Sequence, residues 1–180
     1  MRGGGIVAVI LIGGAAAALV VSRYNLTDSS RAIPSSATEV QRHVPVPIVD
    51  EGEDFTRTPE RVWDGDGPLW CKEGPRVRLA GVAAREMGET CLPHHPCPSA
   101  SATSARDHLV DLVGRPTGTS PEGHILVEGA PLKCHSVGSA KGSRTGAWCE
   151  TASGVDLNCA MVESGTTLKW DRYWGDHRCG

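Results

Sequence analysis

Alternating apolar and polar positions predict short strands in the early part of the region that follows residue 54. Residues 62–63 and 69–71 are apolar stretches, and the turn-forming sequence Asp-Gly-Asp-Gly-Pro lies between them. Residues 76–82 then alternate between charged and apolar side chains, as expected of a strand with one buried face. This pattern predicts a meander of short strands.

A helical period replaces this alternation after residue 101. The apolar positions 102, 105, 109, 112 and 113 share one helical face, and Gly114 is a stop signal. A short helix is predicted over residues 157–164, ending at Gly165. Further strands fit three later stretches, residues 124–128, 131–135 and 147–151. The mixture predicts a mainly β protein of the α+β class.

The amino terminus carries an uncharged run of sixteen residues, from Ile6 to Val21. As a helix this run would span about 24 Å, less than the roughly 30 Å hydrocarbon core of a membrane but more than many signal-peptide cores. Residues 1–23 are therefore interpreted as a signal peptide or a membrane anchor. The Gly13-Gly14 pair disfavours a buried core helix. Both leading interpretations predict export.

Composition divides the rest of the chain into a linker and one folded domain. Residues 24–53 are rich in Ser, Thr and Pro and predict a flexible linker, which leaves residues 54–180 as the domain. The domain holds 14 lysines and arginines against 16 aspartates and glutamates. This balance disfavours a broad electropositive clamp, so any contact with DNA or RNA must be local.

Seven cysteines predict disulfides and an oxidising compartment. A bond between Cys91 and Cys97 would close a short loop, and one between Cys134 and Cys149 would bridge adjacent antiparallel strands. The pairing of the remaining three stays open, with one left unpaired by parity: Cys71, Cys159 and Cys179.

A zinc site is the alternative use of the first two cysteines. Cys91, His94, His95 and Cys97 are chemically suitable ligands. The two adjacent histidines in so short a loop make tetrahedral closure awkward, so zinc is not expected.

Charged residues on and around the predicted strand 76–82 suggest phosphodiester chemistry. Phosphoryl transfer needs fixed cations and a carboxylate that orients water. Arg78 and Arg144 can supply the cations, and Glu86, past a bend at Gly81, can face the same pocket. Asp66 can hold a divalent cation. The alternative is a surface ion pair between Arg78 and Glu86 beside an ordinary turn.

Taken in order, these motifs resemble the staphylococcal nuclease (thermonuclease) family. That family shows Asp-Gly-Asp-Thr, then Arg-Leu-x-Gly-Ile-Asp-Ala-Pro-Glu, then Tyr-Gly-Arg-x-x-Ala and Gly-x-x-Leu-Asn. The corresponding stretches here are residues 64–67, 78–86, 142–147 and 154–158. The resemblance implies a five-stranded OB-type barrel with about three short helices. It also implies that Arg78, Glu86 and Arg144 are the catalytic residues.

Departures from the family pattern weaken the metal site. The family binds calcium with two aspartates and a backbone carbonyl; Asp66 stands at the first position and Ala83 replaces the second aspartate. The Ala84 backbone carbonyl can still serve as a ligand, whereas Arg85 adds a positive charge beside it. Ca²⁺ is therefore expected to bind weakly and the metal dependence to be altered.

The resulting expectation is an exported or membrane-tethered nuclease, a monomer that hydrolyses DNA or RNA in the periplasm or outside the cell. Its partners would be single-stranded or double-stranded nucleic acid and, through residues 6–21, the membrane. Two alternatives stay open: a catalytically inactive OB-type binding module of the cell envelope, and a structural module built by disulfides. Exposed aromatic platforms would favour nucleic acid binding by the first of these.

Overall fold

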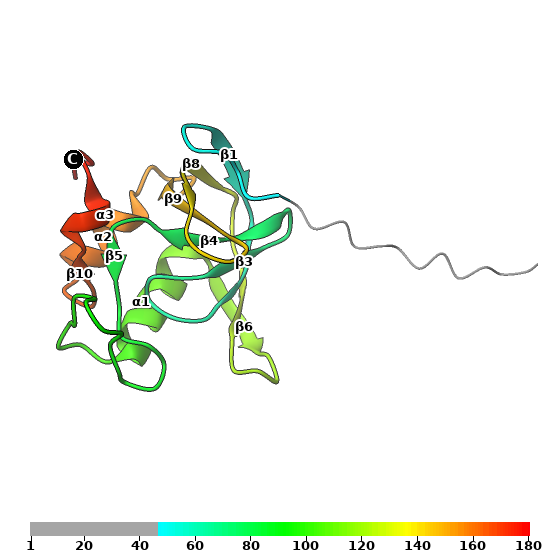
Figure 1. Ribbon diagram of the computed structural model, residues 1–180. Coiled ribbons are helices and arrows are strands. Elements are labelled where there is room, and N and C mark those ends of the chain that lie inside the picture. The colour runs from blue at the N-terminus through cyan, green and yellow to red at the C-terminus, as the bar shows by residue number, and fades with distance from the viewer. Residues whose placement is uncertain (1–46) are drawn as a thin grey trace, which may run out of the picture. The chain divides into compact units, whose positions relative to one another are not determined.

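The computed structural model describes residues 47–180, which form a mainly β structure with helices (Figure 1). The α+β class predicted from the sequence is thereby confirmed. The helices are α1 (Ala102–Val113), α2 (Leu157–Glu163) and α3 (Asp171–Trp174). The strands are β1 (Asp54–Arg57), β2 (Pro59–Val62), β3 (Leu69–Cys71), β4 (Gly74–Leu79), β5 (Val82–Ala83), β6 (Arg115–Thr119), β7 (Ile125–Glu128), β8 (Leu132–Ser139), β9 (Arg144–Glu150) and β10 (Leu168–Lys169).

Eight strands form one mixed sheet in the order β1-β8-β9-β4-β3-β2-β7-β6. All neighbours are antiparallel except β4 and β9, which are parallel. β5 and β10 form a separate antiparallel pair. The six stretches predicted as strands correspond to β2, β3, β4, β7, β8 and β9, and the sheet is larger because β1 and β6 are added at its edges.

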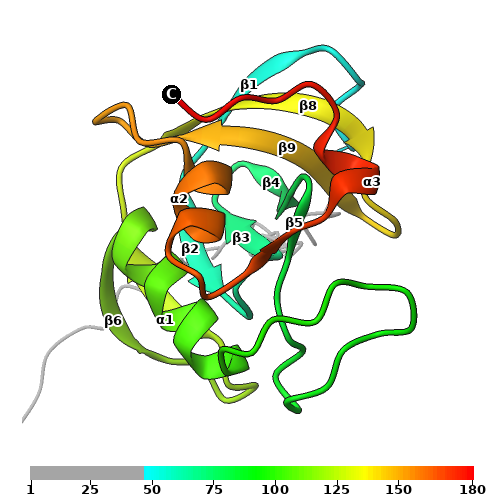
Figure 2. The same ribbon diagram turned by 90° about the vertical axis from the view of Figure 1, so that its left-hand side faces the viewer.

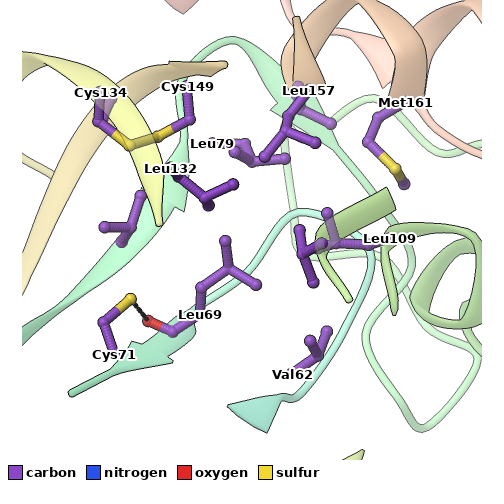
Figure 3. Packing of buried hydrophobic residues seen from close by; sticks show 14 of the residues in the cluster. Val62, Leu69, Cys71, Leu79, Leu109, Leu132, Cys134, Cys149, Leu157 and Met161 are labelled. Atoms are coloured by element: carbon purple, nitrogen blue, oxygen red, sulfur yellow. Dashed lines mark hydrogen bonds between the residues drawn. A yellow bond between two sulfur atoms is a disulfide. The ribbon is translucent and has the colours of Figure 1, made fainter. Parts of the chain in front are cut away.

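The core lies between the strands and the two longer helices, α1 and α2, which lie side by side (Figure 2). Strand residues Leu69, Leu79 and Leu132 meet Leu109 of α1 and Leu157 of α2 there, and all five are at most 1% exposed (Figure 3). Burial of these aliphatic side chains is the main force that holds the helices onto the strands.

Each of the two longer helices starts at a side-chain cap. The hydroxyl of Ser101 accepts a hydrogen bond from the Ser104 N–H at 3.0 Å, and the carboxylate of Asp156 accepts one from the Cys159 N–H at 2.9 Å. α1 ends at Val113 with Gly114 as its C-cap, which agrees with the stop signal predicted at Gly114. These caps explain why both predicted helices form where the sequence places them.

Three disulfides staple the described region, and they fit an oxidising extracellular or periplasmic location. The two predicted bonds are confirmed, and the third resolves the open pairing: Cys91–Cys97, Cys134–Cys149 and Cys159–Cys179. Cys71 is the free cysteine of this region and is buried in the core. Burial raises the pKa of its thiol to about 12, so it stays protonated.

The predicted signal peptide or anchor (1–23) and most of the predicted linker lie outside the described residues. The end of the predicted linker, residues 47–53, lies within the described part of the chain. The Gly52 N–H donates to the Ser136 carbonyl, the Ser136 N–H donates to the Glu53 carbonyl, and the Ser136 hydroxyl donates to the Val49 carbonyl, each at 2.9 Å. These bonds make residues 49–53 part of the folded region. Among residues 47–180, no helix combines the length and apolar character required to cross a membrane.

Candidate functional site

A pocket of about 550 Å³ brings together four stretches of the chain: residues 63–70, 76–86, 122–124 and 141–144. Arg78, Glu86 and Arg144, which the sequence analysis grouped as catalytic, all line it. Their convergence is the first requirement of the predicted chemistry. The charged groups in the lining also include four side chains that were not predicted as site residues: Asp64, Arg76, Glu122 and Lys141.

The parallel pairing of β4 with β9 brings the arginines together. Its register places Arg76 opposite Arg144 and Arg78 opposite Gly146. Arg76 and Arg78 are alternate residues of β4, so they leave the same side of the strand, while Val77 between them is buried in the core. Burial, together with the charges of Arg78 and Arg76, lowers the pKa of Arg144. Arg76 could have been found from its position two residues before Arg78.

Arg78 is held by Asp66, not by Glu86. Its Nη1 and Nη2 donate to Oδ1 and Oδ2 of Asp66, both at 2.7 Å, in a largely buried bidentate ion pair. The Ala84 backbone N–H also donates to Oδ2 of Asp66 at 3.0 Å. Protein donors therefore engage both oxygens of this carboxylate, and the surface ion pair considered as an alternative does not form.

These contacts do not fit the calcium site that the family resemblance implies. Asp66 does not line the pocket, and Ala83 is fully buried and apolar at the position of the second aspartate. Ala84 faces the Asp66 carboxylate with its N–H, so the contact made here is not the predicted carbonyl ligand. A calcium ion would have to displace Arg78 to reach the Asp66 oxygens.

Asp64 is the aspartate that reaches the pocket, whereas the sequence pattern assigns it to a turn. The side chain is nearly buried, and its Oδ1 accepts a hydrogen bond from the Asp66 N–H at 3.3 Å. Burial and, next, the charge of Asp66 raise the pKa of Asp64 from 3.8 to about 9, against the opposing effect of Arg78. Asp64 is therefore protonated at neutral pH, and a protonated carboxyl group can donate a hydrogen bond.

Glu86 is positioned by a tight turn after β5. Its N–H donates to the Thr90 carbonyl at 2.9 Å, and its own carbonyl accepts from the Glu89 N–H at 2.8 Å. Within residues 47–180, its carboxylate takes part in no ion pair. A carboxylate left unpaired beside arginines is available to accept a proton from water.

One end of the pocket is aromatic. The His124 ring centroid lies 4.9 Å from that of Trp63 and 4.4 Å from that of Trp70. The three rings come from the end of β2, from β3 and from the turn before β7. This cluster could not be predicted from the sequence, because the spacing of residues 63, 70 and 124 carries no local signal.

A second group of metal-ligand types occurs at α2. In the described part of the chain, Asp156, Cys159 and His177 are the one group of three whose donor atoms lie within 4.8 Å of one another. Cys159 is bonded to Cys179 and so offers no thiolate. The group therefore lacks a full set of metal ligands. Its disulfide and its ion pair instead attach the carboxyl-terminal segment to α2.

The loop weighed above as a zinc site lacks thiolates for the same reason. Cys91 and Cys97 are bonded to each other. His95 packs against Trp170, with ring centroids 4.1 Å apart. These contacts assign the loop a structural role.

Comparison with known proteins leaves the site to be interpreted from its own geometry. No family model, no curated protein and no solved structure matches the chain.

Proposed function

We propose that this domain is a thermonuclease-like phosphodiesterase that hydrolyses DNA or RNA. The observation that carries the proposal is the convergence of Arg78, Glu86 and Arg144 on one pocket from distant segments. Three cations that line this pocket form no ion pair within residues 47–180: Arg76, Lys141 and Arg144. A phosphodiester is an anion that matches this uncompensated positive charge.

In the proposed reaction, a water molecule adds to phosphorus in line with the departing sugar oxygen. The Glu86 carboxylate takes a proton from this water, and the bond between phosphorus and the sugar oxygen breaks. The departing oxygen takes a proton from solvent. Arg144 donates hydrogen bonds to the phosphate oxygens, where negative charge builds up in the transition state. Arg78 uses two of its N–H groups on Asp66 and has others for the phosphate.

We propose that Ca²⁺ binds only weakly to this site. The ion pair between Arg78 and Asp66 must open before the Asp66 oxygens become available, and opening it costs the buried guanidinium its partner. The residues that act on water and phosphate in the proposed reaction are those of the chain itself.

The scaffold proposed for this site is an OB-type barrel of five strands. β7 pairs with β2, β8 pairs with β9, and only residues 129–131 separate β7 from β8. The run 125–139 therefore links the two ends of the series β2-β3-β4-β9, which supports a closed ring with β1 and β6 as additions.

We also propose that the protein acts as a monomer in the periplasm or outside the cell. The disulfides support export, because cytosolic thiols are kept reduced. Anchoring by residues 6–21 is part of the proposal and concerns a segment outside the described residues.

A binding module without catalysis is the second candidate. The observation that favours it is the engagement of Asp66 by Arg78 and Ala84, together with Ala83 in place of an aspartate. Such a pocket keeps cations for phosphate and lacks a preformed cradle for the family's metal.

Cleavage of a labelled single-stranded DNA by the oxidised full-length chain, with and without added calcium, separates the two candidates. The enzyme proposal predicts that Glu86→Gln and Arg144→Ala each lower the rate by about a hundred-fold or more. Glu163→Gln and Arg172→Ala, which change the same residue types outside the pocket, should cleave like the parent chain. Binding of the DNA without cleavage, both with and without calcium, would contradict the enzyme proposal and support the binding module. Absence of both binding and cleavage would overturn both candidates.

A further inference from the structure

The aromatic end of the pocket is built by side chains that three separate segments bring to one place. The His124 ring contacts both indoles, with interplanar angles of 53° to Trp63 and 73° to Trp70. All three residues are partly exposed and line the same pocket as the arginines. Flat rings that stay accessible inside a pocket offer faces and edges to another flat ring.

Arg76 joins the aromatic end to the cationic end. Its guanidinium lies 5.2 Å from the Trp70 ring centroid, and its Nη2 donates to the Ser143 hydroxyl at 2.7 Å. On the other side, its strand partner is Arg144. A ligand with an aromatic ring and an attached phosphate would therefore meet aromatic rings and guanidinium groups within one continuous pocket.

The charge state of His124 suits an aromatic contact. Burial and, next, the positive charge of Arg61 lower its pKa, and the carboxylate of Glu122 opposes this only in part. The Nδ1 atom lies 3.1 Å from the Ser120 hydroxyl, which fixes the ring orientation. At neutral pH the ring is uncharged, so it presents a π face without repelling the nearby arginines.

We propose that this aromatic end binds one unpaired nucleobase whose phosphate lies among Arg76, Arg78 and Arg144. The inference rests on the proposed function and narrows its substrate to single-stranded nucleic acid. The volume of about 550 Å³ lies in the range of small-molecule sites and suits one nucleotide rather than a duplex. In a duplex the faces of the bases are covered by their neighbours, so they cannot stack on protein rings.

The test compares three fluorescent ligands on the oxidised full-length chain: a short oligothymidylate, an abasic strand with the same sugar-phosphate backbone, and a DNA duplex. Anisotropy titrations give the dissociation constant of each. Oligothymidylate is expected to bind about ten-fold more tightly than the abasic strand, because each stacked base adds about one such factor. The duplex is expected to bind no better than the abasic strand.

Substitution of Trp63 locates the effect. Trp63→Leu should remove the preference for oligothymidylate over the abasic strand, and Trp63→Phe, which restores an aromatic face, should recover most of it. Trp170→Leu is the matched control, because Trp170 packs with His95 and Tyr173 outside the pocket. Near-ultraviolet circular dichroism of each variant, read with the affinity for the abasic strand, reports whether the fold and the phosphate site are intact.

The outcomes separate this inference from the proposed function. Equal affinity for oligothymidylate and the abasic strand would overturn the base site and leave the phosphate site standing. No binding of any of the three ligands would overturn the proposed function itself. A base preference that survives Trp63→Leu, or that Trp170→Leu removes, would overturn the location proposed here.

Discussion

Two pockets of similar size differ in how their charges are paired. The pocket at β4 has a volume of about 550 Å³, and a second one of about 480 Å³ lies along β1, β8 and β9. In the second pocket both histidines are paired with carboxylates: His135 with Asp54 and His177 with Asp156, each at 2.7 Å. In the first, most of the cations have no carboxylate partner within residues 47–180.

The difference separates stabilising charge from charge that is available to a ligand. Paired groups in the second pocket hold the carboxyl-terminal segment to the sheet, together with the stack of Trp148 on His177 at 3.9 Å. The cations that line the first pocket repel one another, and this repulsion destabilises the folded state. Stability of the fold therefore does not explain why they lie together. In the first pocket the cations without an ion-pair partner among the described residues outnumber the carboxylates without one, so this pocket suits an anionic ligand, which its volume alone does not indicate.

Removal of Arg78 should give the largest loss of stability. Among the cations that line the first pocket, Arg78 is the one that forms an ion pair within residues 47–180. Arg78→Ala leaves Asp66 buried without its counter-charge, and we expect a loss of about 3 kcal/mol of unfolding free energy at pH 7. Arg144→Ala should cost less than about 1 kcal/mol, because that side chain has no ion-pair partner to strand. Urea unfolding of both variants measures the contrast. Equal losses would show that the pairing difference has no energetic meaning.

Asp64→Asn should raise the stability at pH 7, because the folded parent must hold a proton on Asp64 that the unfolded chain has released. The folded protein keeps the Asp64 proton up to a pKa of about 9, whereas the unfolded chain releases it near 3.8. The parent chain therefore loses stability relative to the variant as the pH rises from about 4 to about 9. Urea midpoints measured across this range should converge at the acidic end. A gap between variant and parent that does not change with pH would contradict the assignment.

Loss of a paired group in the second pocket should affect stability alone, and by less than the loss of Arg78 does. Asp156→Ala removes the cap of α2 and the partner of His177, with an expected cost of about 1 kcal/mol. Its affinity for single-stranded DNA should match that of the parent within about two-fold, because the pocket lies outside the proposed site. A large loss of DNA affinity without unfolding would place nucleic acid in the second pocket instead.

Local patterns predicted the elements well because their causes are local. Alternation in β4 buries Val77 in the core and turns Arg76 and Arg78 to the other side of the strand, and the spacing of apolar residues in 102–113 fixes the buried face of α1. Two of the disulfides followed from loop length and strand adjacency. Each of these inferences needed only neighbours in the sequence or one turn of chain.

The site was only partly predictable because its remaining members depend on tertiary distance. Nothing in the sequence tells that Arg78 turns to Asp66 rather than Glu86, since both carboxylates flank the same strand. The raised pKa of Asp64 follows from burial beside Asp66, which no motif encodes. The ring cluster at His124 likewise exists only after β2, β3 and β7 have paired.

The parallel register of β4 and β9 has a consequence for biosynthesis. Arg78 and Arg144 are 66 positions apart in the chain, so a ribosome releases the first long before the second. For the proposed nuclease, no nascent or translocating fragment that stops short of β9 holds both guanidinium groups. A nuclease built in this way would therefore have no complete site before β9 has been synthesised.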